Sequence, residues 1–507
     1  MVCVPSGDSP FVSVLTQRDC PCLTHDRKQE KMRRAEINFT QGSIYGKIIK
    51  FILPIIGAYL IQQAYSSADL IFAGQKLGNH AAAAIGASNL IVVLAIGLCG
   101  GLSVGTGIMF SKAYGAKDKD AQRRIGSVVL MLSLFFGGAL AVAGVIFSKP
   151  ILILMQTPEE ILDLATRYIQ VYFPCLVPMM LFNMTAGILR GKGNSTVPMI
   201  FQTIAGGMNV VLDALFIAAW PDGIVGVAVA SIISQGFAAV CTYLYFARTE
   251  RKEWAKEEAE GTLGKVDEED VPLTNRALVG KIFSLGLPVG FQSMLVTLSN
   301  IFIQANINLL GVDSISAFTA YFKVELFMYY PIMSLGQAAL FMVGQNLGAK
   351  TYDRIRPSLA ACIKIGVPLV LAIGTVMFFF GGYAYAVFNP KPEVISEGMK
   401  ILHVTAFPYC IYVVLEVLSN AIRSYGKTKT AMVVSLINYA AARAGLLALY
   451  RALGILNISW VASVFPITWV SATITFYVIW RHIRDKHKAE KNNVKPEVKL
   501  KVVGGKV

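Results

Sequence analysis

Residues 51–75, FILPIIGAYLIQQAYSSADLIFAGQ, contain one charged side chain, that of Asp69. At a rise of 1.5 Å per residue, a helix of this length spans about 37 Å, which exceeds the roughly 30 Å of a bilayer's hydrocarbon core. Similar apolar runs recur from Ile44 to Trp480 and predict twelve membrane-spanning helices. We expect these helices at residues 44–74, 81–110, 125–147, 161–188, 197–219, 224–247, 278–310, 315–346, 358–388, 396–421, 430–451 and 457–480.

The composition agrees with this prediction. Of the 507 residues, 55% are hydrophobic and 15% are charged, and the mean hydropathy is +0.56. A soluble chain of this length would carry about 25% charged residues. The segment AIRSYGKT ends like a phosphate-binding loop, but Ala421 replaces the first required glycine and no strand precedes it. We therefore predict an all-α integral membrane protein that is not an enzyme, has no cofactor or structural metal, and uses an ion gradient as its energy source.

The distribution of the basic residues explains the formal net charge of +15 as a topology signal. Lys and Arg side chains concentrate in alternate loops, and the opposite loops hold few. By the positive-inside rule this distribution places both termini in the cytoplasm, and it argues against a nucleic-acid partner. The basic residues that follow the second, fourth, eighth and tenth predicted helices are Lys112, Lys117, Lys119, Arg123, Arg124, Arg190, Lys192, Lys350, Arg354, Arg356, Arg423, Lys427 and Lys429.

The two halves of the chain repeat each other. KIIKFILPIIG from Lys47 matches KIFSLGLPVG from Lys281, SKAYGAKDKD matches GQNLGAKTYD, and AGILRGKGNS matches SNAIRSYGKT, each at a shift of 233 or 234 residues. The segment TPEEILDLATRYIQVYFP likewise matches KPEVISEGMKILHVTAFP. A duplicated unit of six helices predicts two pseudo-symmetric lobes with the same orientation in the membrane, as in parallel-repeat transporters. A binding site between the lobes is then expected.

This repeat divides the chain into five parts. We expect a cytoplasmic N-terminal segment at 1–43, an N-lobe at 44–247, a charged cytoplasmic connector at 248–277, a C-lobe at 278–481 and a basic cytoplasmic tail at 482–507. Residues 1–31 lack the long apolar run of a signal peptide, and Met32 opens a basic lead into the first helix. We interpret residues 1–31 as an upstream extension without functional weight.

Four acidic residues fall inside predicted helices, where a charge costs about 2.5–3.5 kcal/mol. They are Asp69, Asp213, Glu325 and Glu416. Glu416 lies seven residues before Arg423, near the cytoplasmic end of its helix, and we interpret it as an interfacial residue.

Asp69, Asp213 and Ser231 lie on three different predicted helices of the N-lobe, each seven residues from the outer end. They are therefore at one depth, roughly 10 Å below the outer face. Tyr65 precedes Asp69 by four residues and Asn209 precedes Asp213 by four, so each shares a helix face with its partner. Two carboxylates in a low dielectric favour uptake of a cation or a proton. The alternative is that both aspartates only form hydrogen bonds with neighbouring helices.

Further polar residues are candidates for a substrate cavity. Asn300, Gln304 and Asn308 form a stripe on the seventh predicted helix, and Glu325 and Arg443 could form a buried pair, either at the cavity or as a structural contact. The candidate cavity residues are Gln63, Asn183, Asn300, Gln304, Glu325 and Arg443.

Several motifs in register resemble the multidrug and toxic compound extrusion (MATE) family, from Ile44 to Arg481. They are LPIIGAYLIQQAYSSADLIFAGQKLG in the first helix, SKAYGAKD after the second, GILRGKGNSTVPM between the fourth and fifth, NVVLDALFI in the fifth, GVAVASIISQ in the sixth and VGQNLGAK after the eighth. The resemblance implies a plasma-membrane, multi-pass antiporter, functional as a monomer, that exports amphipathic and often cationic compounds in exchange for H⁺ or Na⁺.

The resemblance also implies roles for individual residues. In family members with a coupling site in the N-lobe, a first-helix Asp, an Asn-x-x-x-Asp in the fifth helix and a sixth-helix Thr form that site. By match these are Asp69, Asn209, Asp213 and Ser231, with Tyr65 beside Asp69 and Ser in place of Thr. These residues would also hold a transported Na⁺. Pro54 matches a proline about which the first helix is proposed to bend.

Three alternatives stay open from the sequence. MATE proteins distantly resemble flippases for lipid-linked precursors, whose cavity should contain several basic residues; here Lys323 and Arg443 are the plausible ones. Export of an endogenous metabolite is a second alternative. A membrane receptor or scaffold that transports nothing is a third, but it would not need a matched cluster of acids.

Overall fold

The structure is a computed structural model that describes residues 36–77, 79–219, 223–258, 267–268 and 270–493. The upstream extension at 1–31, part of the connector and the end of the tail lie outside these ranges. Within them, all regular elements are helices. Eleven are long and apolar enough to cross a membrane, and a bent pair, Pro392–Thr405 with Tyr409–Ser424, makes a twelfth span. The all-α membrane fold and its twelve spans are therefore confirmed.

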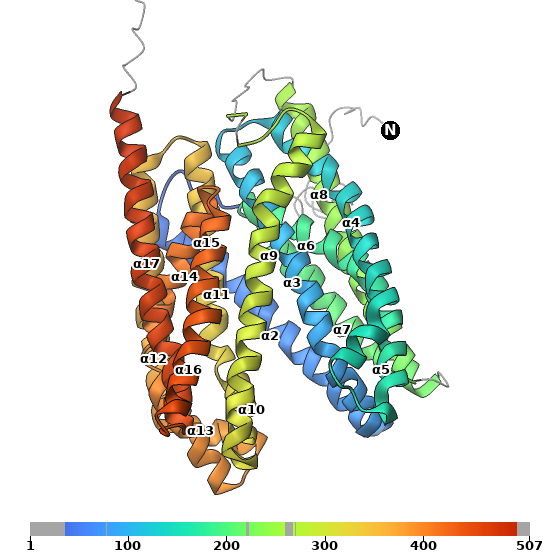
Figure 1. Ribbon diagram of the computed structural model, residues 1–507. Helices are drawn as coiled ribbons and strands as arrows, with labels where there is room; N and C mark the ends of the chain where they lie inside the picture. The colour runs from blue at the N-terminus through green and yellow to red at the C-terminus, as the bar shows by residue number, and fades with distance from the viewer. Residues whose placement is uncertain (1–35, 78, 220–222, 259–266, 269, 494–507) are drawn as a thin grey trace, which may run out of the picture.

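Helices α2 to α8 form the N-lobe, and α9 to α17 form the C-lobe (Figure 1). The N-lobe helices are α2 (Ile44–Leu77), α3 (Asn79–Gly115), α4 (Lys119–Leu154), α5 (Glu159–Tyr172), the 3₁₀ turn η1 (Phe173–Cys175), α6 (Leu176–Gly191), α7 (Thr196–Ala219) and α8 (Gly223–Glu258). The C-lobe helices are α9 (Asn275–Ile307), η2 (Asn308–Leu310), α10 (Val312–Val324), α11 (Leu326–Gly348), η3 (Tyr352–Arg354), α12 (Ile355–Phe388), α13 (Pro392–Thr405), α14 (Tyr409–Ser424), α15 (Thr428–Ser435), the π-helical turn η4 (Leu436–Ala442), α16 (Arg443–Ala452) and α17 (Ile458–Asn493).

The repeat found in the sequence recurs in backbone detail. The chain leaves α3 and α11 through Lys117 and Lys350, which both adopt the left-handed conformation with φ of 59° and 56°. Two equivalent spans are interrupted at Pro174 and Pro408, where the ring removes a backbone donor. The two lobes therefore share their turns and breaks as well as their helix order.

Two helices continue beyond the predicted spans. α8 runs to Glu258, inside the predicted connector, and α17 runs to Asn493, inside the predicted tail. Both extensions are rich in Lys, Glu and Arg, which have high helix propensity in water. Apolar length marks where a helix leaves the bilayer, but it does not mark where the helix ends.

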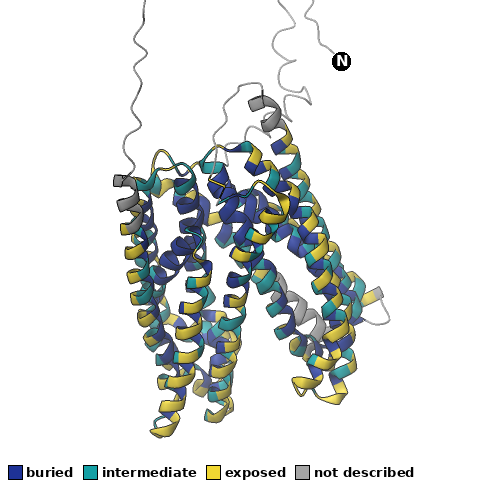
Figure 2. Cartoon of the chain, turned by 45° about the horizontal axis from the view of Figure 1, so that its top comes forward, coloured by how far each residue is buried: buried dark blue, intermediate teal, exposed yellow. Residues whose placement is uncertain are grey.

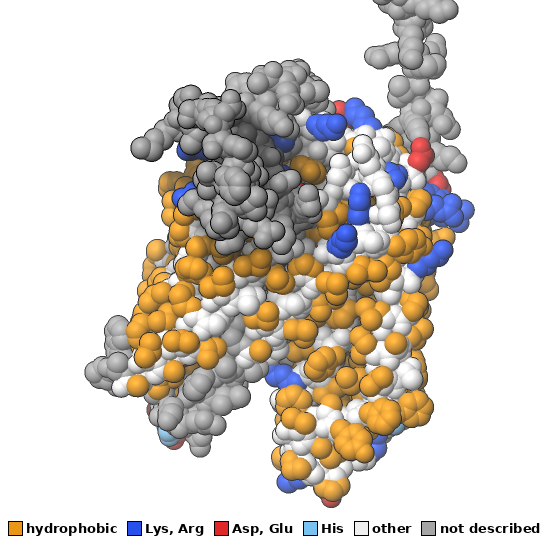
Figure 3. All heavy atoms as spheres, turned by 180° about the vertical axis from the view of Figure 1, so that it is seen from behind, with side chains coloured by type: hydrophobic (Ala, Val, Ile, Leu, Met, Phe, Trp, Pro, Cys, Tyr) orange, Lys and Arg blue, Asp and Glu red, His pale blue; other side chains and the backbone are white. Residues whose placement is uncertain are grey.

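The lobes meet at one end and separate at the other, so the molecule is V-shaped (Figures 1 and 2). We call the end with the turns at 116–118 and 349–351 the closed end. Its contact is backbone to backbone: a Cβ on Gly115 would overlap the carbonyl oxygen of Gln345, and one on Gly348 would overlap that of Lys112. At the opposite, open end a notch separates the lobes in the space-filling view (Figure 3).

The exposed surface between the two ends is apolar. Phe135 on α4 and Phe379 on α12 are 74% and 68% exposed, although water would disfavour both side chains. Figure 3 shows hydrophobic side chains over the middle of the molecule, with Lys and Arg side chains gathered near the closed end. This distribution is that of a multi-pass protein whose middle faces lipid.

Residues 36–43 cross the closed end and contact both lobes. Ile37 N donates to the carbonyl of Gly193 at 3.2 Å, in the N-lobe. Phe39 N donates to Gln345 Oε1 at 2.9 Å, and Arg354 Nη2 donates to the carbonyl of Gly42 at 2.8 Å, both in the C-lobe. This segment therefore links the lobes in the arrangement seen here.

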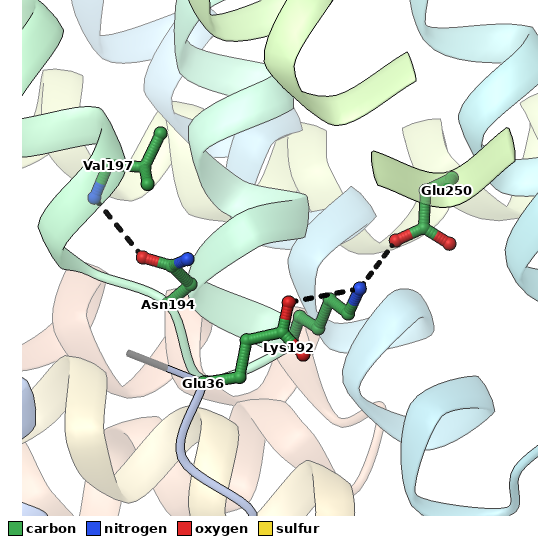
Figure 4. Close-up of polar contacts among 5 residues, drawn as sticks. All are labelled: Glu36, Lys192, Asn194, Val197 and Glu250. Carbon is green, nitrogen blue, oxygen red and sulfur yellow. Dashed lines mark hydrogen bonds and ion pairs between the residues drawn. The ribbon is translucent and has the colours of Figure 1, made fainter. Parts of the chain in front are cut away.

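A buried ion cluster lies under this segment (Figure 4). Lys192 Nζ is 2.9 Å from Glu250 Oε1 and 3.2 Å from Glu36 Oε1, and the side chains of Lys192 and Glu250 are each 1% exposed. Two residues further along, Asn194 Oδ1 accepts a hydrogen bond from Val197 N and caps the first turn of α7. The cluster thus ties the loop before α7 to α8 and to residue 36.

We expect Lys192→Met to destabilise the protein by about 3–5 kcal/mol, because it leaves buried carboxylate charge without its cation. Lys149→Met is the matched control, since Lys149 and its partner Asp163 are 54% and 87% exposed and such pairs contribute less than about 1 kcal/mol. Thermal unfolding in detergent compares the two variants. Equal shifts in unfolding temperature would contradict the role of the buried cluster.

Candidate functional site

A cavity of about 450 Å³ lies between the lobes. Helices α2, α3, α6, α7 and α8 line it from the N-lobe, and α9, α11, α14 and the turn η4 line it from the C-lobe. Its polar and aromatic lining residues include Tyr59, Gln62, Asn183, Arg190, Gln202, Gln235, Gln292, Tyr329, Gln337, Tyr412, Glu416, Asn420, Arg423 and Tyr439. A cavity is therefore present at the lobe interface, where the repeat predicted a binding site.

One group of hydrogen bonds crosses the cavity from lobe to lobe. Gln337 on α11 accepts a hydrogen bond from Arg190 Nη1 at 3.3 Å and donates to the hydroxyl of Tyr59 on α2. The Tyr59 ring stacks on Tyr330 at 5.1 Å between centroids, and the Tyr330 hydroxyl donates to Gln63 Oε1 at 3.2 Å. Helix α2 is thereby joined to the C-lobe beside the cavity.

A second polar chain lies within the C-lobe. Asn420 Nδ2 donates to Glu416 Oε1 at 2.6 Å, and Asn420 Oδ1 accepts from Arg423 Nη1 at 3.0 Å. Arg423 Nη2 then donates to Gln292 Oε1 at 2.9 Å, and Gln292 Nε2 donates to Ser435 Oγ at 2.6 Å. The spacing of four and three residues on α14 puts Glu416, Asn420 and Arg423 on one helix face. The chain fixes this face toward the cavity.

Consecutive residues of α11 lie against the two charged groups of opposite lobes. Gly336 is close to Glu416, since an added Cβ would lie 2.8 Å from Glu416 Cγ. Gln337, the next residue, contacts Arg190 of the N-lobe. Glycine at 336 therefore leaves the space that Glu416 occupies.

The acidic group predicted in the N-lobe is placed in part. Asn209 and Asp213 are 3% and 0% exposed on α7, and Ser231 is half-buried on α8, which packs against α7. Tyr65 and Asp69 fall on α2, which packs against the same helix, but their side chains lie outside the described residues.

Their positions along the helices agree in depth. Asp213 lies six residues before the open end of α7, Asp69 eight residues before that of α2, and Ser231 eight residues after that of α8. At 1.5 Å per residue these offsets are roughly 9–12 Å. That these residues form one coupling pocket stays a prediction.

Pro54 lies inside α2 and cannot donate the backbone hydrogen bond of a regular helix. The carbonyl of Phe51, one turn away, also accepts from Ser195 Oγ at 2.7 Å. Ser195, in the loop before α7, therefore holds α2 beside the turn in which Pro54 leaves one backbone hydrogen bond unmade.

Of the candidate cavity residues, Asn183 lines the cavity, and Gln63 contacts Tyr330 next to it. The other four lie outside the described lining. Gln304 is half-buried and donates to Asn308 Oδ1 at 2.8 Å, while Glu325 accepts from the Tyr409 hydroxyl.

Glu325 and Arg443 do not pair directly in the described structure. Arg443 donates to Ser299 Oγ at 3.3 Å and approaches Asn300 Oδ1 at 3.5 Å. Its guanidinium also lies 4.9 Å from the Phe465 ring centre. These contacts direct Arg443 toward α9 and α17.

Sequence reasoning missed the charged residues of the cavity itself. Glu416, interpreted as interfacial, is 6% exposed and lines the cavity, and this interpretation was wrong. Arg190 and Arg423 line the cavity, but they were interpreted only as basic loop residues that indicate the cytoplasmic side. The basic residues predicted for a cavity, Lys323 and Arg443, lie outside its described lining. The repeat held the missing signal, because the shift of 233 residues relates Glu416 to Asn183 and Arg423 to Arg190.

Comparison with known proteins gives one consistent result. The family model described as MatE matches residues 54–215 and 288–446, so the matched segments begin at the two repeat-related prolines. A relative named "Probable multidrug resistance protein YpnP" from Bacillus subtilis is 28% identical over 419 residues, covering 82% of this chain and 90% of that protein. "Multidrug export protein MepA" from Staphylococcus aureus is 22% identical over 402 residues, covering 79% and 86%.

A solved structure described as "MATE in complex with MaL6" has the same fold. It superposes with a TM-score of 0.78 at 21% identity, covering 89% of this chain and 99% of that chain.

Proposed function

The chain belongs to the MATE family, and from this premise we propose that it is a secondary active antiporter. It exports amphipathic, often cationic, organic compounds in exchange for H⁺ or Na⁺ by alternating access. The multidrug-export names of its relatives support this proposal. The observation that carries it is the fully buried Asp213, one helical turn from Asn209 on α7. A carboxylate inside a membrane-spanning helix is costly, and such residues mark ion or proton sites.

The closed end then faces the cytoplasm and the cleft opens to the outside. Basic residues in the turns of the closed end support this orientation under the positive-inside rule. In this orientation both termini are cytoplasmic. A single chain in the plasma membrane is sufficient for transport, because the two lobes that line the cavity belong to the same chain.

Coupling operates through α2. This helix packs against α7 in the N-lobe and against α11 in the C-lobe. Ion uptake at Asp69 and Asp213, with Tyr65, Asn209 and Ser231 as further ligands, changes the charge on the outer half of α2 and α7. A bend at Pro54 then moves Tyr59 away from Gln337 and loosens the cavity, so that the compound leaves outward before the lobes rock.

A flippase for a lipid-linked precursor is the second candidate function, because Arg190 and Arg423 give the cavity the basic residues that such a role requires. The cavity volume of about 450 Å³ favours a drug-sized molecule, for which pockets of roughly 300–1,000 Å³ are usual. Export of an endogenous metabolite of similar size is compatible with the same site.

Uptake of a fluorescent organic cation into everted membrane vesicles tests the antiport. A Na⁺ gradient alone and a pH gradient alone are imposed in separate runs, and we expect one of them to drive accumulation. One charge moving across ~150 mV supplies about 3.5 kcal/mol, which supports a concentration ratio of roughly 300-fold. Accumulation that is the same with and without both gradients would contradict the proposal and favour a non-coupled role.

A further inference from the structure

Two side chains at equivalent positions of the repeat lie at the closed end, on the seam between the lobes. SKAYGAKDKD and GQNLGAKTYD align Lys112, near the end of α3, with Gln345, near the end of α11. The backbone carbonyls of these two residues lie against Gly348 and Gly115 of the opposite lobe. Both side chains therefore start from the place where the lobes must separate if the closed end opens.

Gln345 holds the segment that leads into the N-lobe. Its Oε1 accepts from Phe39 N at 2.9 Å, and its Nε2 donates to the carbonyl of Gly191 at 2.8 Å. Both ends of one C-lobe amide thus bind backbone that belongs to the N-lobe side. Gln345 is fully buried, and Phe39 is 2% exposed. Because a buried donor or acceptor is costly to leave unpaired, this neutral contact opposes separation of the lobes.

Lys112 holds the segment that leads into the C-lobe. Its Nζ lies 2.5 Å from Asp270 Oδ1, five residues before α9 begins at Asn275. The Lys112 side chain is 7% exposed, and Val271, next to Asp270, is 1% exposed. A backbone turn places this carboxylate, since Val271 N donates to the carbonyl of Asp267 at 3.1 Å. A partly buried ion pair of this kind is screened much less than a surface pair.

The two contacts cross between the lobes. A C-lobe side chain holds the segment that leads into the N-lobe, and an N-lobe side chain holds the segment that leads into the C-lobe. We propose that these contacts, Gln345 with Phe39 and Lys112 with Asp270, form a latch that keeps the closed end shut, and that both break before the lobes separate there. The connector is then part of the gate. This inference rests on the alternating access of the proposed function, but not on which compound or ion is moved.

A charge exchange tests the ionic half of the latch. Spin labels on cysteines at the exposed positions 120 and 356, in the first turns of α4 and α12, report the separation of the lobes in purified protein without substrate or ion gradient. We expect Lys112→Glu and Asp270→Lys, each alone, to raise the ratio of longer to shorter distances at least about tenfold, since a hydrogen bond to a charged group is worth about that much. The double variant re-forms the pair with reversed charges and restores the wild-type ratio. The Asp270 side chain is 35% exposed, so Asp270→Lys places its charge where water reaches it.

Gln345→Met tests the neutral half, because methionine keeps the length of the side chain and removes both hydrogen bonds. We expect the same shift toward longer distances. Gln122→Met is the matched control, since Gln122 is also fully buried but donates to the carbonyl of Ala113 at 3.2 Å, within the N-lobe. Lys149→Glu is the control for the ionic half, because this exposed lysine pairs with Asp163 at the open end. Both controls should keep the wild-type ratio.

An unchanged ratio in Lys112→Glu and Asp270→Lys, a double variant that stays as open as the single variants, or an unchanged ratio in Gln345→Met would each overturn the inference. A shift of equal size in Gln122→Met or Lys149→Glu would also overturn it, because the effect would then follow from lost stability and not from the latch. Failure of gradient-driven dye uptake would instead contradict the antiport and leave these distances as they are.

Discussion

Asp213→Asn is expected to reduce ion-gradient-driven export to less than about a tenth of the wild-type rate. The substitution keeps the shape of the side chain but removes the negative charge that a proton or Na⁺ can neutralise. A gradient can drive the lobes only through an ion whose affinity differs between their arrangements. Asp213 is fully buried on α7, so solvent does not screen the charge that the substitution removes.

The measurement is dye accumulation in everted vesicles under whichever gradient drives the wild-type protein. Asp69→Asn should have the same effect without loss of expression. Asp163→Asn is the control, because this exposed aspartate lies on α5 at the open end and pairs with Lys149 at 3.2 Å. Wild-type export by both Asp213→Asn and Asp69→Asn would remove these residues from the coupling site. Dye binding that survives in Asp213→Asn separates lost coupling from lost folding.

Gly115→Val is expected to slow export at least about tenfold through the closed end of the molecule. A side chain at this position overlaps the carbonyl oxygen of Gln345 in the other lobe, and neither backbone can move without separating the lobes. Overpacking of this kind costs about 1–3 kcal/mol, which shifts the equilibrium between lobe arrangements by roughly 5- to 150-fold. Gly348→Val should act in the same way, because its side chain would meet the carbonyl of Lys112.

Spin labels on cysteines at positions 117 and 350 report the separation of the two closed-end turns. We expect a longer distance in Gly115→Val than in the wild-type protein. Gly280→Ala is the control, because a Cβ at Gly280 meets no atom within 4 Å. An unchanged distance together with slow export would place the defect elsewhere.

The bilayer explains why so much of the fold could be predicted. Each span must bury its backbone hydrogen bonds in a helix and present apolar side chains to lipid, so apolar length alone identifies spans. The matching turns at Lys117 and Lys350 were visible as repeated Gly-Ala-Lys sequences. The π-helical turn η4 was not visible, because the carbonyl of Tyr439 accepts from Ser299 on a distant helix, a contact that only packing creates.

Of the predicted site, the sequence indicates the depth of single residues along their helices. Asp213 and Ser231 were proposed from their distance to the outer helix ends, and they lie six and eight residues from the ends of α7 and α8, while their role in one coupling pocket stays a prediction. Arg190 and Glu416 were not identified, since a charged residue near a helix end looks the same whether it faces water or a cavity. Whether such a residue faces water or the cavity depends on how the two lobes associate, which the sequence of a single helix does not indicate.

Ion movement driven by the exported compound tests the central claim most directly. Purified protein in liposomes is given an outward or inward gradient of a transported dye with no ion gradient and no membrane potential, and the internal pH and Na⁺ are followed. Antiport predicts that dye movement carries H⁺ or Na⁺ in the opposite direction, and that Asp213→Asn abolishes this flux. Dye that crosses the membrane without moving either ion would contradict the account.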